Sequence, residues 1–373
     1  MKVYLDNAAT TPLEANVLDV MKKTMETVYG NPSSIHAAGR LARTTIEDAR
    51  KRIANHLKAS QGEIFFTSSA TESNNTAIQG AVRDLGIKKI ISSPTEHPCV
   101  LNSIKRVQDE KGAKIEMLIV DEHGRIDIEE LREKLKTSDI PTLVSIMHAN
   151  NEIGTIQDIK SIGDACADYG ALFHCDTVQT VGKHDIDVST SNISFLSGSG
   201  HKIYGPKGSG FLYVNNKNIV QPLIVGGGQE RNMRSGTENT YGIAGLAAAL
   251  DNIIENRTDY KRQIDHLVKR FKNNIQAMNM DISFNGCPDN YLAHIVNLSV
   301  PQTEKAEMIM MNLDIYGICA SAGSACNSGI ENASHVIQAI QQSSDRKALR
   351  FSFSHHNTIE EVDYVTDTLK NIL

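Results

Sequence analysis

The segment Ser197-Gly-Ser-Gly-His-Lys-Ile-Tyr-Gly-Pro-Lys-Gly208 is the part of the sequence that best indicates the fold and chemistry of this chain. It lies between two apolar runs, residues 193–196 and 210–214, and each run predicts a buried strand. A lysine that two strands hold against a site is partly shielded from water, which lowers its pKa and suits it to Schiff-base chemistry. Glycine N–H groups, together with Ser199 and His201, suit a phosphate. Taken alone, the same composition is also typical of a glycine-rich surface turn with solvated lysines.

Length and composition narrow the class of protein. The chain has 373 residues, which predicts two domains, and its composition, 40% hydrophobic and 22% charged, is that of a soluble globular protein. The formal net charge of −6 argues against a nucleic-acid-binding surface. The N-terminus does not read as a signal peptide and no apolar run approaches a membrane span, so we expect a cytoplasmic protein without a membrane partner.

The 6 cysteines are scattered, and no C-x-x-C occurs. This spacing indicates neither a zinc site nor a disulfide framework, so we expect no metal and a reducing compartment. Cys326 differs from the others because it lies in a run of small and polar residues, 320–329. A thiol in such a loop could enter a pocket and act as a nucleophile. A lone cysteine is more often inert, so other residues have to support this interpretation.

Strands and helices alternate between residues 64 and 176. This order predicts an α/β fold with a mainly parallel sheet covered by helices on both faces. The expected strands are 64–66, 89–92, 115–120, 142–147 and 172–176, and the expected helices include 14–28, with Pro12 in its first turn, 37–57, 98–110, 128–135 and 159–169.

Polar residues follow the ends of these strands repeatedly. They are Thr71, His97, Asn150, Asn151, Asp176 and Gln179. Ligands of parallel sheets collect beyond the carboxyl ends of the strands, so the recurrence predicts a pocket. The turn 67–75 lies between a strand and a helix, where helix N–H groups and the helix dipole favour an anion. A plain helix N-cap would use the same Ser and Thr residues.

The pattern changes after an Ala-rich helix, 241–255. Strands and helices then follow in the manner of an α+β fold. We predict a large domain, 14–256, and a small domain formed by 1–13 and 257–373 that carries Cys326. Its expected elements are a helix over 258–278, strands over 281–285 and 294–300, a helix over 305–313, a strand over 349–354, and a final helix that starts at the capping box Thr358-Ile-Glu-Glu361.

Several segments form an ordered set along nearly the whole chain. They are Tyr4-Leu-Asp-Asn-Ala-Ala-Thr-Thr11, Gly30-Asn-Pro-Ser-Ser-Ile-His36, Phe66-Thr-Ser-Ser-Ala-Thr-Glu-Ser-Asn-Asn75, Thr95-Glu-His97, His148-Ala-Asn-Asn-Glu-Ile-Gly154, Ser199-Gly-His-Lys202, Arg234-Ser-Gly-Thr-Glu-Asn239, Gly323-Ser-Ala-Cys326 and Leu349-Arg-Phe-Ser352. This set resembles class V pyridoxal-phosphate enzymes, most closely the cysteine desulfurases of the nitrogen-fixation and iron–sulfur-assembly type. The resemblance implies fold type I of the PLP-dependent transferases, with a mainly parallel sheet in a large domain and a smaller α+β domain.

The resemblance also implies pyridoxal 5'-phosphate as the cofactor, bound covalently by Lys202. Asp176 would pair with the pyridinium nitrogen, so that the ring remains an electron sink. His97 would stack on the ring and assist proton transfers, while Gln179 and Asn151 would contact the ring hydroxyl and the substrate side. The phosphate would be bound by Thr71, Ser199 and His201 and, from the neighbouring subunit of a homodimer, by Thr237. Ala70 would also contact the cofactor.

The same resemblance implies a reaction, the conversion of L-cysteine to L-alanine. The Cys326 thiolate would attack the substrate sulfur and hold it as a persulfide. The sulfur would then pass to an acceptor protein, such as an iron–sulfur scaffold or a tRNA thiolase. Arg350 would clamp the substrate carboxylate, a bidentate role for which lysine is a poor substitute, with Asn31 and Asn151 beside it.

The chain departs from the family pattern after Ser352, where it reads Phe353-Ser-His-His-Asn-Thr358 and many relatives have a glycine and a basic residue. It is also short behind Cys326, so the resemblance leaves the sulfur acceptor open. An aminotransferase or a selenocysteine lyase would be the alternative class V activities, although an aminotransferase needs no thiol. A non-catalytic sulfur carrier or scaffold would keep Cys326 but gives no reason for the lysine, histidine and aspartate of the cofactor site.

Overall fold

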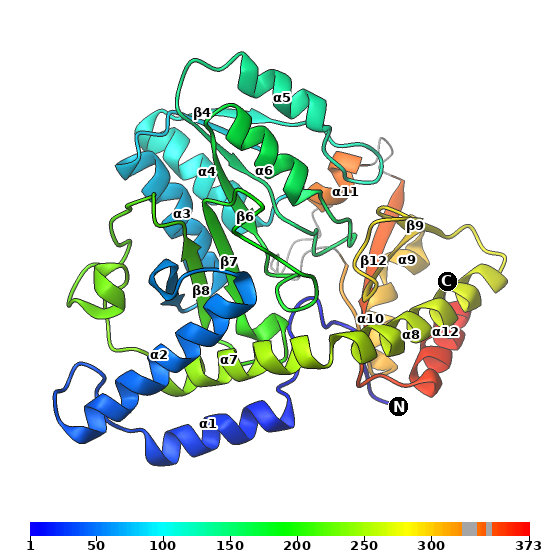
Figure 1. Ribbon diagram of the computed structural model, residues 1–373. Helices are drawn as coiled ribbons and strands as arrows, with labels where there is room; N and C mark the ends of the chain where they lie inside the picture. Colours follow the sequence, from blue (N-terminus) through cyan, green and yellow to red (C-terminus); the bar gives the residue numbers. More distant parts are fainter. Residues whose placement is uncertain (323–333, 341–344) are drawn as a thin grey trace.

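The computed structural model describes residues 1–322, 334–340 and 345–373 (Figure 1). The predicted nucleophile Cys326 lies outside these residues. Of the helices that the structure describes, none is both long and apolar enough to cross a membrane.

A seven-stranded sheet with the order β2-β8-β7-β6-β5-β3-β4 forms the centre of the molecule. Its strands are β2 (Ile64–Thr67), β3 (Lys89–Ser92), β4 (Lys114–Met117), β5 (Thr142–Ser145), β6 (Leu172–Asp176), β7 (Phe195–Ser199) and β8 (Gly210–Val214). The neighbours from β7 to β4 pair in parallel, whereas β8 pairs antiparallel with both β7 and β2. The prediction of a mainly parallel sheet is confirmed.

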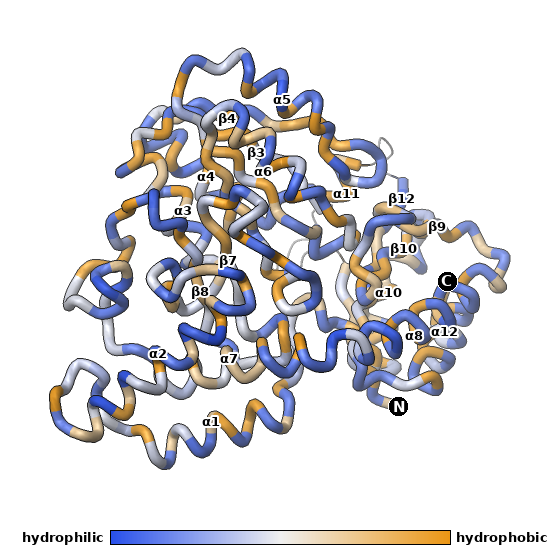
Figure 2. Tube along the Cα trace, in the orientation of Figure 1, coloured by the Kyte–Doolittle hydropathy of each residue, from blue (hydrophilic) through white to orange (hydrophobic). Residues whose placement is uncertain are grey.

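Helices cover both faces of this sheet because successive side chains of each strand point to opposite faces. Phe65 packs into a core under α3 (Ala70–Asp84) and α4 (Pro98–Lys111), while its neighbour Phe66 packs into the larger core on the other face. The elements that complete the larger core are α1 (Ala15–Thr27), α2 (Ala37–Leu57), α5 (Ile128–Lys136), α6 (Ile159–Asp168) and α7 (Thr240–Glu255). Figure 2 shows that apolar segments concentrate along the strands between these helices.

A further core lies around a three-stranded antiparallel sheet with the order β12-β10-β9, on the right in Figure 1. Its elements are α8 (Arg257–Ala277), β9 (Ser283–Asn285), β10 (Ile295–Pro301), α9 (Glu304–Glu307), α10 (Ile309–Ile315), β12 (Arg346–Ser352) and α12 (Ile359–Ile372). Val3 and Leu5 of the N-terminal segment belong to this core, and β1 (Val3–Tyr4) pairs in parallel with β11 (Ile318–Cys319). The division of the chain into domains at residues 13 and 256 stays a prediction.

Several elements differ from the sequence-based expectation. The helix expected at 305–313 is interrupted at Met308, which separates α9 from α10. The first helix begins at Ala15 with Glu14 as its N-cap residue, so Pro12 precedes the helix instead of lying in its first turn. Some short elements were not expected from the sequence. They are the paired strands β1 and β11, the helix α11 (His335–Ile340), and the 3-10 helices η1 (Gln61–Glu63), η2 (Gly200–Lys202) and η3 (Gln229–Asn232). The capping box at Thr358 is confirmed.

Candidate active site

Lys202 lies at the end of η2, directly after β7, where the antiparallel pair β7–β8 turns. The N-terminal segment crosses this turn, because Thr11 N–H donates to the His201 carbonyl at 2.9 Å. The Lys202 ammonium is half-buried and donates hydrogen bonds to the carbonyl oxygens of Ala8 and Ala9. The fold therefore holds this lysine against the N-terminal segment at the sheet edge.

Asp176 is buried at the carboxyl end of β6, the strand that pairs in parallel with β7, which Lys202 follows. Its Oδ2 accepts from the Asn74 amide at 2.7 Å, and its Oδ1 accepts from the Val178 N–H at 3.0 Å. The side-chain oxygen Oδ1 of Asn74 lies 3.0 Å from His174 Nε2. The other ring nitrogen, His174 Nδ1, lies 2.8 Å from the Ser145 hydroxyl. Because burial lowers the pKa of His174 to about 4, this ring is neutral and can donate to Asn74. The network fixes the amide orientation of Asn74 and therefore the position of the Asp176 carboxylate.

His97 is the N-cap residue of α4, and its Nδ1 accepts a hydrogen bond from the Cys99 N–H at 3.1 Å. Burial lowers the pKa of His97; the charge of Asp176 opposes this shift, and Lys202 adds to it. A neutral ring that accepts at Nδ1 carries its proton on Nε2. Both charged side chains thus act on one imidazole, whose Nε2–H can donate a hydrogen bond.

Gln179 follows β6 by three residues and is buried. Its amide nitrogen donates to the Ala8 carbonyl at 3.0 Å, the same oxygen that accepts from Lys202. Its amide oxygen Oε1 is buried and has no hydrogen-bond partner in the described part of the chain. An orphaned polar atom beside Lys202 fits a ligand that carries a hydroxyl group, since unpaired buried polar atoms are costly.

The predicted phosphate-binding residues lie at two neighbouring places. Ala70 and Thr71 start α3, whose N-cap residue Ser69 accepts from the Glu72 N–H. Ser199 is buried at the end of β7, paired with Gly210, while His201 Nδ1 lies 3.3 Å from the Thr10 hydroxyl. Burial, with the charges of two nearby lysines, lowers the pKa of His201 to about 4, so its ring is neutral. The first turn of a helix with accessible N–H groups is a favourable place for a phosphate.

Arg350 lies on β12 and is buried. Its Nη2 donates to Asp6 Oδ1 at 2.8 Å and its Nη1 donates to the Asn151 carbonyl at 3.0 Å. Its Nε has no hydrogen-bond partner among the described residues. The Ser321 hydroxyl donates to the same Asp6 oxygen at 2.8 Å. Arg350 is therefore a fixed, pre-oriented cation with donor capacity left for a carboxylate ligand.

Two of the predicted residues, Asn31 and Thr237, lie in exposed loop segments. Asn31 is exposed in the loop between α1 and α2, which Figure 1 shows at the lower left, away from β12. Thr237 is exposed in the segment before α7, near the ion pair of Arg234 Nε with Glu72 Oε1 at 2.9 Å. The structure brings Lys202, Gln179, His97, Asp176 and the first turn of α3 to one region.

Some residues of this region were missed by sequence reasoning. Asn74 and Asp6 lie inside quoted motifs, but their partners are distant in sequence, so nothing local indicated a role. Glu96 is fully buried with a raised pKa caused by burial, and its Oε1 accepts from the Met147 N–H at 2.6 Å. Lys183 lies 3.2 Å from His294 Nε2, and burial, with the charge of Lys202, lowers its pKa to about 7. No motif pointed to Lys183.

Comparisons with known proteins find similar proteins along the whole chain. The family model described as Aminotransferase class-V matches residues 3–365. A protein named putative cysteine desulfurase IscS 1, from Bacillus subtilis, is 39% identical over 381 residues, covering 100% of this chain and 99% of its own. Among solved structures, one described as a NifS-like protein superposes with a TM-score of 0.91 at 34% identity, covering 100% of this chain and 99% of its own. A structure of SspA in complex with cysteine gives a TM-score of 0.81 at 34% identity, covering 96% and 100%.

Proposed function

This chain belongs to the class-V aminotransferase family and is a pyridoxal-phosphate-dependent cysteine desulfurase, and on that premise we propose that it converts L-cysteine to L-alanine with Lys202, His97 and Cys326 as its catalytic residues. L-Cysteine as the substrate is supported by the related structure that contains cysteine. The observation that carries the assignment of residues is the convergence of Lys202 and Gln179 on one carbonyl oxygen, that of Ala8.

The residues around Lys202 fit pyridoxal phosphate. Lys202 would bind the cofactor covalently, and Asp176 would pair with its ring nitrogen. The orphaned Oε1 of Gln179 would face the ring hydroxyl, and the phosphate would lie at Ala70, Thr71, Ser199 and His201. When bound, the cofactor supplies an electron sink for the electrons released at the substrate α-carbon.

The protein's own groups have separate tasks around this cofactor. Asp176, held by the Asn74 amide, keeps a negative charge at one fixed position. His97 would assist proton transfers through Nε2, since its Nδ1 is engaged by the Cys99 N–H. Burial raises the pKa of the Cys99 thiol to about 12, so this cysteine is protonated and does not compete as a nucleophile.

The substrate carboxylate would bind Arg350, which Asp6 and the Asn151 carbonyl hold in place. We propose that Asn31 joins this site from a neighbouring subunit, because its loop lies away from β12 within one chain. Thr237 would reach the phosphate in the same way. A homodimer is also favoured by large apolar side chains that are exposed in these loops, among them Tyr29 and Ile35, which are 83% and 90% exposed.

Cys326 would accept the sulfur. Its thiolate attacks the substrate sulfur, so that an S–S bond forms and the substrate C–S bond breaks. The electron pair of that bond goes to the substrate carbon, which takes a proton and leaves as alanine. The persulfide on Cys326 then passes its outer sulfur to an acceptor protein, an iron–sulfur scaffold or a tRNA thiolase. We further propose a cytoplasmic location, which is supported by the free thiols of the described cysteines.

The decisive experiment compares the parent enzyme with three variants. With L-cysteine and a thiol reductant, the parent should be yellow and form alanine and sulfide in equal amounts. Lys202→Ala should lose the bound chromophore, whereas Lys207→Ala, which changes an exposed lysine of the same segment, should retain it. Cys326→Ala should keep the colour and lose desulfuration. A colourless parent that stays inactive with added pyridoxal phosphate would refute the assignment of Lys202.

A further inference from the structure

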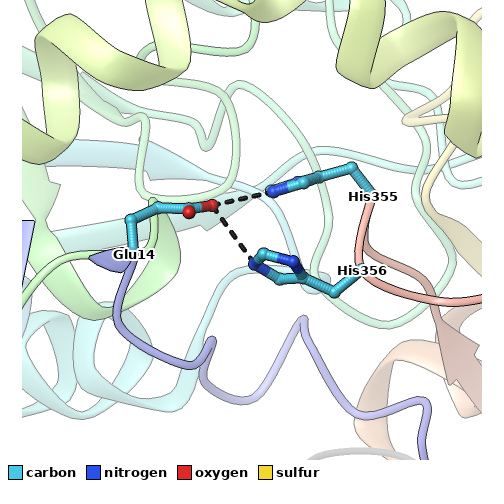
Figure 3. Close-up of side chains that lie close together, drawn as sticks. All are labelled: Glu14, His355 and His356. Carbon is cyan, nitrogen blue, oxygen red and sulfur yellow. Dashed lines mark ion pairs between the residues drawn. The ribbon is translucent and has the colours of Figure 1, made fainter. Parts of the chain in front are cut away.

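A second cluster of ligating side chains lies outside the proposed active site (Figure 3). Glu14 immediately precedes α1, and His355 and His356 lie in the turn between β12 and α12. Glu14 Oε1 lies 2.8 Å from His355 Nε2 and 3.2 Å from His356 Nε2.

The close contacts of Glu14 Oε1 with the two histidines are not hydrogen bonds. Although Glu14 Oε1 is close to both imidazole nitrogens, it is a buried atom that takes part in no hydrogen bond in the described part of the chain. The ring N–H directions therefore do not point at the carboxylate. Side chains that approach closely without pointing at one another are expected where their lone pairs converge on a shared point.

The spacing of the three atoms is that of ligands around one ion. All three ligand atoms lie within 4.8 Å of one another. In a tetrahedral zinc site with bonds of about 2.0–2.1 Å, neighbouring ligand atoms are about 3.3 Å apart. The distances from Glu14 to the two histidines need only a few tenths of an ångström of adjustment to reach this value.

We propose that Glu14, His355 and His356 form a site for a divalent transition-metal ion, with Zn²⁺ as the best-suited ion. Two imidazole nitrogens favour zinc over magnesium and calcium, which prefer oxygen ligands. The His356 side chain is 46% exposed, so solvent can reach the ion and supply its fourth ligand.

Aromatic side chains surround the site and fix its first histidine. Tyr260 of α8 stacks on His355 with ring centroids 3.6 Å apart and an angle of 2° between the planes. Tyr204 contacts the same ring edge-on at 4.8 Å. Glu14 N–H donates to the Tyr204 carbonyl at 3.1 Å. Tyr204 follows Lys202 by two positions, so a bound ion would join the start of α1, the turn after β12 and the lysine segment.

Direct metal binding tests this site. The holoenzyme is first treated with iodoacetamide, because free cysteines also bind zinc. Titration with Zn²⁺ against a chromophoric chelator should then show about one ion per chain, since three side chains and water complete one tetrahedral site. Co²⁺ should give visible absorption bands beyond the cofactor band, with the intensity of a tetrahedral complex. Neither readout depends on desulfuration.

Variants test whether Zn²⁺ binds at this site or at other histidines. His356→Ala and Glu14→Gln should each weaken Zn²⁺ binding by at least about 100-fold, since even indirect partners of a metal site contribute 10–100-fold. Glu14 makes no side-chain cap hydrogen bond to α1, so its replacement should leave the helix intact. His266→Ala, at an exposed position on α8, is the matched control and should bind as the parent does. Zn²⁺ should also raise the melting temperature of the parent but not of His356→Ala. Absence of binding by the parent, or equal binding by parent and His356→Ala, would overturn the proposal and leave a simple ion pair.

Discussion

Asp176 illustrates how single residues of this site depend on partners that are far away in the sequence. The aspartate ends β6, but its carboxylate is oriented by Asn74 on α3, and Asn74 is oriented in turn by His174. Arg350 depends in the same way on Asp6, from the opposite end of the chain. The side chains proposed to react were chosen from their motifs, and their roles stay a prediction. The residues that hold them were not assigned, because their hydrogen bonds exist only after the chain has folded.

Asn74 provides a prediction at this scale. Asn74→Ala removes the 2.7 Å hydrogen bond to Asp176 but keeps the aspartate itself. A hydrogen bond to a charged group contributes about 1.5–3 kcal/mol, so kcat/KM for desulfuration should fall about 10–100-fold. The pH at which the visible band of the bound cofactor changes should shift in the same variant, because the carboxylate is no longer fixed.

Asn75→Ala is the control for this prediction. Asn75 is the next residue on α3, and its amide donates to the Thr71 carbonyl instead of to Asp176. Asn75→Ala should therefore cause no shift of the visible band, and its rate should be close to that of the parent. If Asn74→Ala were as active as the parent and had the same spectrum, Asn74 would have no positioning role.

At the scale of elements, the strand pair β7–β8 depends on glycines that let two strands approach. Gly198 faces Phe211 across this pair, and a Cβ atom at Gly198 would lie 2.3 Å from the Phe211 ring. The ring is fully buried and has no room to move aside. Gly198→Ala should therefore lower the free energy of unfolding by about 1–3 kcal/mol, the usual cost of overpacking a core.

Urea denaturation of Gly198→Ala measures this cost. Gly62→Ala serves as the control, since a Cβ atom there meets nothing within 4 Å. Phe211→Leu introduced into Gly198→Ala should recover part of the loss, because the two changes act on one contact. An unchanged denaturation midpoint for Gly198→Ala would show that β7 and β8 can separate without cost.

Elements with strong local signals could be predicted, and those set by distant contacts could not. The strand β6 and the helix α2 have the expected bounds, because an apolar run or a helical period defines them locally. The strand β1 has only two residues and exists through its pairing with β11. Similarly, α9 and α10 were expected as one helix, since the interruption at Met308 leaves no mark such as glycine or proline.

At the scale of the whole molecule, the N-terminal segment joins parts that the sequence order separates. Leu5 belongs to the core around β12, Ala8 accepts from Lys202 and Gln179, and Glu14 contacts the turn after β12. The sequence predicted that residues 1–13 join the small domain, but its motif did not indicate which contacts hold the segment. Its place follows from pairing of β1 and from burial of Leu5, both of which require the folded C-terminal part.

Buried histidines make the stability of the whole molecule depend on pH. Burial lowers the pKa of His148 to about 3, whereas an unfolded histidine has a pKa of about 6.5. Between these values the unfolded chain binds a proton that the folded chain does not, so the folded state loses stability as pH falls below about 6.5. A fully depressed histidine contributes a slope of about 1.4 kcal/mol for each pH unit. Glu96 acts in the opposite direction, because its raised pKa favours the folded state at low pH.

The difference between parent and His148→Asn isolates one of these histidines from all other titrating groups. Both proteins are unfolded with urea at several pH values between 7.5 and 5, with excess pyridoxal phosphate. The parent should lose more stability than the variant as pH falls, by up to about 1.4 kcal/mol for each unit below 6.5. His266→Asn, at an exposed position, should keep the parent's slope. The free energy of unfolding could instead depend on pH with equal slopes in the parent and His148→Asn. His148 would then become protonated in the folded protein as readily as in the unfolded chain, and the acid sensitivity would arise from other groups.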